Sequence, residues 1–276
     1  MSGKLYLVAT PIGNLEDITL RAINCLKEVD IIAAEDTRHT LKLLNHLEIK
    51  KKLISNHRHN EDVKSSILIN FLLEGKNIAL VSDAGTPGIC DPGEEIVKLA
   101  IKNEIEIVPI PGACALINAL IASGMNTTEF AFYGFLPLNK KNRKEKLEEI
   151  KEETKTIILY EAPHKLLNTL NDIQKLLGEE TKIVLARELT KIHEEFIRGS
   201  ITKIIENITD VKGEFIIIIE GRSKESIEKN EYVNMSLEEL YEKFENEGVS
   251  KKEIIKKIAK IKNVNKNEIY QHFLNK

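Results

Sequence analysis

Short apolar runs alternate with stretches of helical periodicity through the first part of the chain. One predicted helix follows a cap at Asp17 and continues to Leu26. The apolar runs are typical of buried strands, and they are Leu5 to Ala9, Ile31 to Ala34, Leu53 to Ser55, Ile78 to Val81 and Ile105 to Ile110. Strands that alternate with helices favour a mostly parallel sheet with helices on both faces. We therefore expect a parallel five-stranded α/β domain over residues 1–111.

The pattern changes after Pro109-Ile110-Pro111-Gly112, which is typical of a hinge and leads into a helix that ends near Ser123. Further apolar runs follow with fewer helices between them: Phe130 to Tyr133, Thr156 to Tyr160, Lys182 to Ala186, Glu195 to Arg198 and Phe215 to Glu220. This spacing predicts a mixed sheet in a second α/β domain over residues 112–222, followed by a polar linker over 223–235.

Residues 236–276 show helical periodicity again and predict a small helical domain. The expected helices run from Leu237 to Glu247, from Lys251 to Lys260 and from Asn267 to Leu274. Gly248-Val249-Ser250 joins the first two, with Ser250 as a cap, which is the outline of a helix-turn-helix. Lysine is frequent here, which indicates either an electrostatic footprint for RNA or an ordinary solvated surface.

Composition restricts the function classes. The formal net charge is −3, so an RNA contact would have to come from local basic patches. Cys25, Cys90 and Cys114 show no C-x-x-C spacing, which argues against a disulfide framework or a zinc site and suits a reducing cytosol. No apolar run approaches the roughly 20 residues of a membrane span, and the start lacks the apolar length of a signal peptide. We expect a soluble cytoplasmic protein without a metal site.

The loop from Ser82 to Gly93 is the most informative segment. Its twelve residues hold three glycines and two prolines, and they follow the strand Ile78 to Val81 directly. Glycine permits close backbone approach and proline removes freedom, so this loop has a rigid shape. Ligands bind at the carboxyl ends of strands in open α/β sheets, and we expect one here. The chain has no G-x-G-x-x-G, P-loop or G-x-S-x-G motif.

Three clusters of ionisable residues also follow strands: Glu35 to His39, Tyr160 to His164 and Arg187 to Glu195. Each cluster has a functional and a structural interpretation. The residues either position a substrate, or they belong to a charged helix N-terminus or a solvated surface. The segment Gly134-Phe135-Leu136-Pro137 leads into a basic stretch, Lys140 to Lys146. This stretch suits a phosphate backbone, but it equally suits the exposed first turns of a helix.

These segments, in this order, resemble the ribosomal RNA small-subunit methyltransferase I family of the tetrapyrrole methylase superfamily. The resemblance spans about residues 3 to 221. It rests on Leu7 to Leu15, Asp17 to Thr19, Ala34 to Thr40, Ser82 to Gly93, Pro109 to Gly112, Gly134 to Pro137, Tyr160 to His164, Leu185 to Glu195 and Lys212 to Phe215. The chain departs from the family pattern at Cys90 and at Ala113-Cys114, where Ser and Pro-Ser are expected.

The resemblance implies two α/β domains with S-adenosylmethionine between them, usually in a homodimer. It implies methyl transfer to the ribose 2′-OH of a cytidine in small-subunit (16S) ribosomal RNA. An assembled 30S subunit would reconcile an RNA substrate with the net charge of −3. By resemblance, the cofactor-binding residues are Asp83, Ala84, Gly85, Thr86, Pro87, Pro111, Gly112, Ala113, Tyr160, Glu161, Gly213, Glu214 and Phe215.

Methyl transfer from a sulfonium is an in-line displacement, so the protein contributes mainly positioning. Because a 2′-OH is a weak nucleophile, an acceptor for its proton would help. Strand-end position and the resemblance nominate Asp36, Glu161 and Glu188 as acceptors. They nominate Arg38, His164 and Arg187 as substrate-orienting groups. The alternatives are a tetrapyrrole methylase that acts on carbon, which has no obvious need for a lysine-rich tail, and a non-catalytic RNA-binding protein, which has no need for the Gly/Pro loops.

Overall fold

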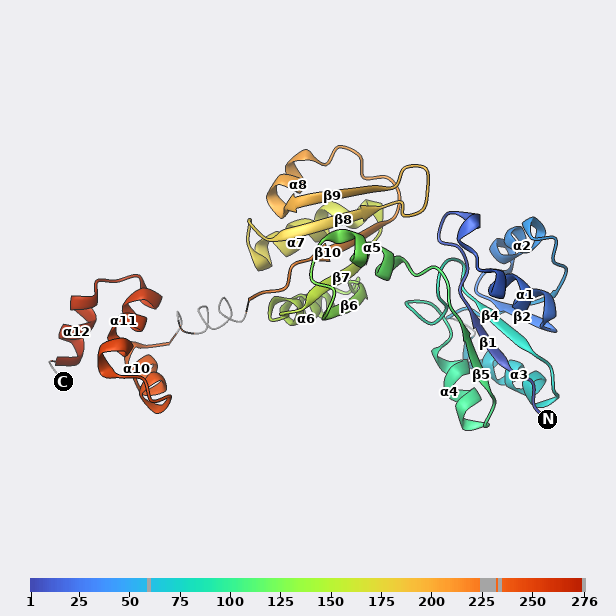
Figure 1. Ribbon diagram of the computed structural model, residues 1–276, viewed down its shortest axis with the longest axis horizontal. Helices are drawn as coiled ribbons and strands as arrows, with labels where there is room; N and C mark the ends of the chain where they lie inside the picture. The colour runs from blue at the N-terminus through green and yellow to red at the C-terminus, as the bar shows by residue number, and fades with distance from the viewer. Residues whose placement is uncertain (59–60, 224–231, 233–234, 275–276) are drawn as a thin grey trace.

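The computed structural model describes residues 1–58, 61–223, 232 and 235–274. The first part of the chain forms a five-stranded sheet in the order β3-β2-β4-β1-β5, in which all pairings are parallel (Figure 1). Its strands are β1 (Leu5–Val8), β2 (Ile31–Ala34), β3 (Lys52–Ser55), β4 (Ile78–Val81) and β5 (Ile107–Ile110). The predicted parallel sheet is confirmed.

Helices cover both faces of this sheet. The helices α1 (Leu20–Glu28) and α2 (Thr37–His46) bury Leu26 and Leu44 against one face. The helices α3 (Glu61–Leu73) and α4 (Glu94–Lys102) bury Leu72 and Ile96 against the other. Every residue of β2 and β4 is buried, which explains why these runs are continuously apolar instead of alternating.

The cap of α1 differs from the prediction. Asp17 ends a short 3₁₀ turn, η1 (Leu15–Asp17), and Thr19 caps α1 by accepting a hydrogen bond from the Ala22 N–H at 3.1 Å. Asn14 caps η1 separately, and Asp17 belongs to that turn. Thr19 is therefore the residue that caps α1.

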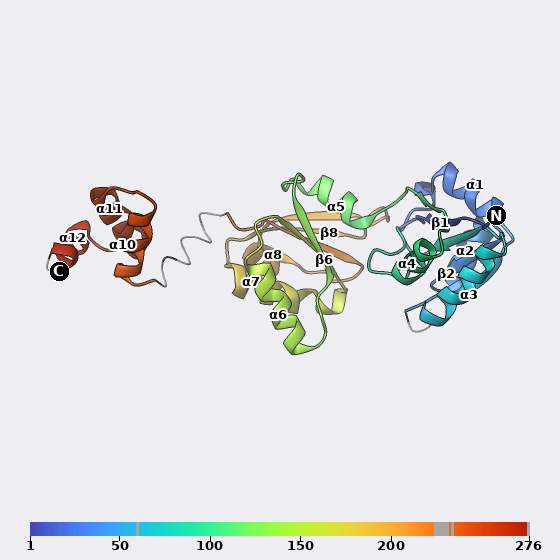
Figure 2. The ribbon, with the colours of Figure 1, turned by 90° about the horizontal axis from the view of Figure 1, so that it is seen from below.

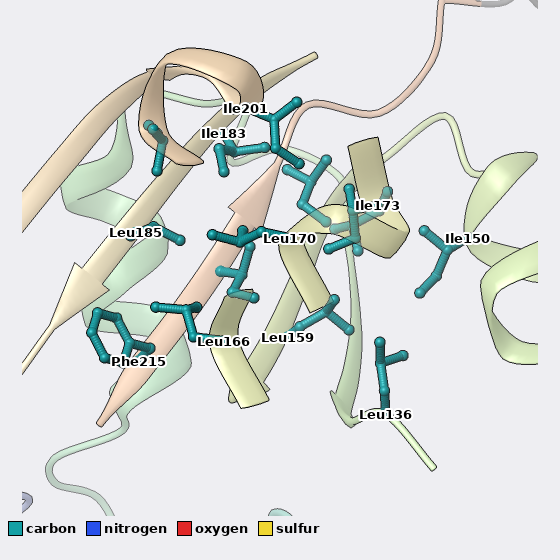
Figure 3. Close-up of a cluster of buried hydrophobic side chains, with 14 residues drawn as sticks. Leu136, Ile150, Leu159, Leu166, Leu170, Ile173, Ile183, Leu185, Ile201 and Phe215 are labelled. Atoms are coloured by element: carbon teal, nitrogen blue, oxygen red, sulfur yellow. The ribbon is translucent and has the colours of Figure 1, made fainter. Parts of the chain in front are cut away.

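The second sheet has the order β6-β7-β10-β8-β9, in which β6 and β7 are parallel and the other pairs are antiparallel. Its strands are β6 (Phe130–Phe135), β7 (Thr156–Glu161), β8 (Lys182–Arg187), β9 (Glu195–Ser200) and β10 (Phe215–Ile219). The helix α5 (Ala115–Ser123) packs on one face. The other face carries α6 (Lys140–Lys151), α7 (Leu166–Leu177) and α8 (Ile201–Asn207), and the short turn η2 (Pro163–Lys165) leads into α7. Figure 3 shows Leu166, Leu170 and Ile173 of α7 against the strand side chains.

The end of the chain forms a helical unit with a core of its own, seen apart from the two sheets in Figures 1 and 2. Its helices are α10 (Leu237–Asn246), α11 (Lys251–Lys262) and α12 (Lys266–Leu274), close to the predicted ranges. Ser250 precedes α11 as expected, but its hydroxyl bonds the Glu253 carboxylate instead of a backbone N–H. Most of the linker predicted over 223–235 lies outside the described residues, and the division into domains stays a prediction. No helix in the described ranges is both long and apolar enough to cross a membrane.

Candidate active site

A cavity of about 540 Å³ lies where the carboxyl ends of β2 and β4 face the second sheet. From the first sheet it is lined by Ile12, Glu35, residues Asp83 to Thr86 and Ile89 to Asp91. From the second it is lined by Cys114, Ala115, Phe135, residues Tyr160 to Pro163, Ala186, Leu189 and Glu214 to Ile216. Strand ends of an open sheet are where ligands are expected, and this is the candidate site.

A larger cavity of about 770 Å³ lies at the opposite end of the second sheet, near Lys182 and Arg222. Its Arg198 already donates to the carbonyl oxygens of Ala122 and Ser123. None of the predicted site residues lines this larger cavity. Because Arg198 already uses its donors on the backbone, few of them are left to bind a ligand there. We therefore place the candidate chemistry in the smaller cavity.

The loop after β4 is fastened on two sides. The N–H of Gly85 donates to the Thr10 carbonyl at 3.0 Å, and the Thr10 N–H donates to the Gly85 carbonyl at 2.9 Å. On the far side, the Thr86 hydroxyl donates to the Ala113 carbonyl at 3.1 Å. Gly85 has φ +84, which a side chain would strain. The rigidity predicted for this loop thus comes from contacts with the end of β1 and with the hinge.

Three carboxylates from the first sheet face the cavity: Glu35, Asp83 and Asp91. Asp83 accepts a hydrogen bond from the Asp36 N–H at 2.9 Å, which joins the ends of β2 and β4. Burial raises the pKa of Glu35, and the charges of Asp91 and Asp83 raise it further. Burial is also the main cause that raises the pKa of Asp91. This wall of the cavity therefore favours a cationic ligand.

Replacing Asp91 by Asn should stabilise the protein at neutral pH. Because the pKa of Asp91 is raised on folding, the folded protein holds the proton more tightly, and ionisation costs folding free energy as pH rises through that pKa. Asp91→Asn removes this cost, so we expect a melting temperature about 1–3 °C above wild type at pH 8. The difference should vanish below about pH 4, where an unfolded aspartate is protonated. Asp17→Asn, at an exposed site, is the control, and a lower melting temperature for Asp91→Asn at pH 8 would contradict the prediction.

Glu161, at the end of β7, is the best-fixed carboxylate of the cavity and only 5% exposed. Its Oε1 accepts from the Ala162 N–H at 2.9 Å, and its Oε2 accepts from the Thr169 hydroxyl. The Arg143 Nη2 donates to Thr169 Oγ1 at 3.0 Å, so the single hydroxyl hydrogen of Thr169 is left for Glu161. Each carboxylate oxygen keeps a lone pair for a ligand.

Tyr160 lines the cavity beside Glu161 and is fixed by its hydroxyl, which accepts from the Leu116 N–H at 3.2 Å. Its ring meets Phe132 and Phe135 edge-on, with centroids 4.9 and 5.7 Å apart. Burial raises the pKa of this phenol well above its usual range. Tyr160 therefore stays neutral and serves as a rigid wall.

Glu188 lies behind the cavity wall. Its Oε1 accepts from the Glu214 N–H and from Lys191 Nζ, both at 2.9 Å. Burial alone would raise the pKa of Glu188, but the hydrogen bonds from Glu214 and Lys191 outweigh it and lower that pKa. Gly213 has φ +92, and a Cβ there would lie 2.5 Å from Glu188 Cγ. Glu188 thus positions the Gly213–Phe215 segment, whose Glu214 and Phe215 line the cavity.

The structure separates the other nominated residues from the lining. Asp36 caps α2 by accepting from the Arg38 N–H at 2.8 Å, and it pairs with the Arg38 side chain, which is 88% exposed. This pairing holds the pKa of Asp36 well below its usual range. His164 is exposed in η2. The remaining residues outside the lining are Pro87, Pro111, Gly112, Ala113, Gly213, Glu188 and Arg187.

The Arg187 side chain is bonded to other residues of the second domain, and we expect it to stabilise the folded protein. Its side chain is 13% exposed, pairs with Asp210 at 2.6 Å and donates from Nε to the Lys212 carbonyl at 2.8 Å. We expect Arg187→Ala to lower the melting temperature by about 4–8 °C, because a half-buried charged network loses its donor. Turnover and KM of the folded protein should stay near wild type. Lys182→Ala, which removes an exposed pair with Glu220, is the control. A lower turnover at unchanged melting temperature would instead support the substrate-orienting role.

Comparison with known proteins identifies the family. The model of the tetrapyrrole (corrin/porphyrin) methylases matches residues 4–205. The chain belongs to the tetrapyrrole methylase family. Among curated relatives, "Ribosomal RNA small subunit methyltransferase I" of Halalkalibacterium halodurans is 50% identical over 97% of this chain and 93% of that protein. The protein of the same name from Bacillus subtilis is 48% identical over 98% of this chain and 94% of its own length. The family resemblance seen in the sequence is confirmed.

Solved structures agree with the tetrapyrrole methylase fold. A diphthine synthase aligns with a TM-score of 0.63 at 13% identity, covering 79% of this chain and 90% of that one. A uroporphyrin-III C-methyl transferase from Thermus thermophilus, complexed with S-adenyl homocysteine, aligns with a TM-score of 0.57 at 15% identity, covering 79% and 97%. At these identities the likeness establishes the two-domain fold.

Sequence reasoning missed several lining residues of this tetrapyrrole methylase. Glu35, Asp91 and Phe135 line the cavity and belong to sequence motifs described above, but the motifs alone do not indicate a role for them. The other missed residues are Ile12, Ile89, Cys90, Cys114, Ala115, Ala162, Pro163, Ala186, Leu189 and Ile216. Most of these residues are adjacent in sequence to a predicted site residue or lie at a strand end, and this position is the feature that could have identified them. Among the described residues, no group of His, Cys, Asp and Glu side chains could hold a metal ion.

Proposed function

We propose that this protein transfers a methyl group from S-adenosylmethionine to the ribose 2′-OH of a cytidine in small-subunit (16S) ribosomal RNA. The observation that carries the proposal is the cavity at the strand ends, where Asp83 to Thr86, Tyr160, Glu161, Glu214 and Phe215 meet. Relatives at about half identity over nearly the whole chain carry a ribosomal RNA methyltransferase name, which supports the substrate class.

The cavity fits S-adenosylmethionine in size and charge. A volume of about 540 Å³ suits a small-molecule cofactor. The carboxylates of Glu35, Asp83 and Asp91 suit its cationic sulfonium and ammonium groups, and the apolar side near Leu189 and Ile216 suits its adenine. We propose that the Asp83–Pro87, Pro111–Ala113, Tyr160–Glu161 and Gly213–Phe215 segments hold the cofactor, with Pro87, Pro111 to Ala113 and Gly213 acting through the backbone of their neighbours.

The bound cofactor supplies an electrophilic methyl group, and the residues of the chain orient the acceptor and receive its proton. Of the nominated acceptors, only Glu161 lines the cavity, with both oxygens fixed by donors. We propose that Glu161 accepts a hydrogen bond from the reacting hydroxyl or from the cofactor. Asp36 and Glu188 act indirectly, by positioning residues that line the cavity. The Asp36 N–H donates to the Asp83 carboxylate, and the Glu188 carboxylate accepts from the Glu214 N–H.

The proposal extends to partners and location. The substrate we propose is a 30S subunit at or near full assembly, because a net charge of −3 suits recognition by shape and local patches better than binding of free RNA. We also propose that the protein works in the cytoplasm as a homodimer. Sedimentation at micromolar concentration tests the dimer directly.

Methyl incorporation tests the function. Labelled S-adenosylmethionine is incubated with small subunits that lack the modification, with naked ribosomal RNA alongside, and the RNA is digested to nucleosides. The expected result is label in 2′-O-methylcytidine from the subunits. Label on a base or on another ribose would overturn the stated specificity. Cofactor binding without incorporation into either RNA would move the proposal to the tetrapyrrole substrates of the wider family.

A further inference from the structure

The rim of the cavity exposes an aromatic ring. Phe135, the last residue of β6, lines the cavity and is 56% exposed. The neighbouring Ile89 lines the same cavity and is 40% exposed, and Leu138 follows at 77%. Exposed apolar side chains at the mouth of a cavity are typical of a surface that a partner covers.

The backbone around Phe135 is shaped to put the ring there. The pairing of β6 with β7 shifts register between Phe132 and Gly134, and Gly134 has φ +63. Such irregularities re-aim side chains next to active sites. The Cys90 thiol occupies the space at Gly134, since a Cβ there would lie 2.7 Å from Cys90 Sγ. On the other side, the Phe135 ring rests edge-on against Tyr160, with an interplanar angle of 65°.

The segments next to Phe135 in the fold and in the chain carry positive charge. Arg58 reaches the rim from the first domain, and its Nη2 donates to the Cys90 carbonyl at 2.6 Å. Helix α6 starts at Lys140 and carries no acid in its first turn, although the helix dipole disfavours cations at that end. Within the described part of the chain, neither Lys140 nor Lys144 has a carboxylate within 4 Å, whereas Arg143 pairs with Asp172. Cations kept at an unfavourable helix end and left unpaired suit a phosphate backbone.

We propose that Phe135 is a stacking platform for an unstacked nucleobase of the RNA substrate, with Lys140 and Lys144 on the adjoining phosphates. This inference rests on the proposed function and deepens it. Proteins read RNA chiefly at unpaired nucleotides, whose bases stack on aromatic side chains. A nucleotide must also leave the stack before its ribose can enter a cavity. A ring at the mouth would hold the displaced strand while the 2′-OH reaches Glu161.

The first experiment measures methylation of small subunits by the full-length protein with single variants. Stacking is worth roughly a factor of 5 to 100 in affinity, so Phe135→Ala should raise KM for the subunit by about that factor with turnover little changed. Phe135→Tyr should restore KM because it keeps the ring, whereas Phe135→Leu should not. Phe130→Ala is the matched control, because Phe130 starts the same strand, is 38% exposed and does not line the cavity.

The second experiment separates this inference from the proposed function. Filter binding of small subunits, with S-adenosylhomocysteine present, measures RNA affinity without methyl transfer. The double variant Lys140→Ala, Lys144→Ala should make the negative slope of log affinity against log salt shallower by about 1–2. Phe135→Ala should leave this slope unchanged. Full affinity of Phe135→Leu would overturn the stacking role. An equal loss of S-adenosylhomocysteine binding in Phe135→Ala would assign the ring to the cofactor instead. Tight subunit binding without methylation would overturn the function and leave the stacking site intact.

Discussion

Replacing Glu161 by Gln is expected to weaken cofactor binding or methyl transfer by roughly 10- to 100-fold, which is what loss of a charge-assisted hydrogen bond costs in a shielded site. The protein should stay folded. Gln can accept from the Ala162 N–H with its oxygen and donate to Thr169 Oγ1 with its nitrogen, so both contacts are kept and only the Thr169 hydroxyl hydrogen loses its acceptor. The variant removes the negative charge and changes little else. Calorimetric titration with S-adenosylhomocysteine and initial rates on small subunits together locate the loss.

Two further variants sharpen this test. Glu153 precedes the same strand and accepts from the Tyr133 hydroxyl and from the Thr154 and Lys155 N–H groups, but it does not line the cavity. Glu153→Gln should therefore leave binding and turnover unchanged. Thr169→Val should reproduce part of the Glu161→Gln effect, and Thr169→Ser, which keeps the hydroxyl, should not. Normal binding and turnover in Glu161→Gln would remove Glu161 from the proposed chemistry.

The loop positions of this site were predictable from sequence because they depend on local chemistry. Glycine and proline density after a buried strand marks a shaped loop wherever it occurs, and Gly85 indeed faces the cavity. Strand ranges were predictable for the same reason, since runs such as Ile78 to Val81 are buried on both faces of the sheet.

The identity of the cavity-facing acid was not predictable at this level. Glu35 and Asp36 are adjacent at the end of β2, and either suits the role of a strand-end carboxylate. Asp36 becomes the cap of α2, which turns its side chain back to the Arg38 N–H and leaves Glu35 to line the cavity. The role of Arg187 was not predictable for a similar reason. Its partner Asp210 lies 23 residues away in the sequence, and the two meet only in the folded protein.

Replacing Gly134 by Ala is expected to destabilise the protein by about 2–3 kcal/mol and to lower methyl transfer. Part of the cost is backbone strain, because φ is +63 at this position. The rest is steric, since the new Cβ would lie 2.7 Å from Cys90 Sγ, at the place where the loop after β4 touches the second domain. Either the loop or β6 has to move, and Ile89, Cys90, Asp91 and Phe135 line the cavity there. Urea unfolding and initial rates measure the two effects.

The steric part can be isolated with Cys90→Ala. This change removes the sulfur that Gly134→Ala would meet, so the double variant should regain about 1 kcal/mol relative to the sum of the single effects, together with part of the lost rate. The strain at φ +63 should persist in the double variant, because it belongs to residue 134 alone. Gly124 has φ +80, and a Cβ there would meet no atom within 4 Å, so this residue provides the strain-only control. Gly124→Ala should cost about 1 kcal/mol without a change in rate. Additive effects of Gly134→Ala and Cys90→Ala would mean that the two residues do not meet, and the contact between the domains would then lie elsewhere along the loop.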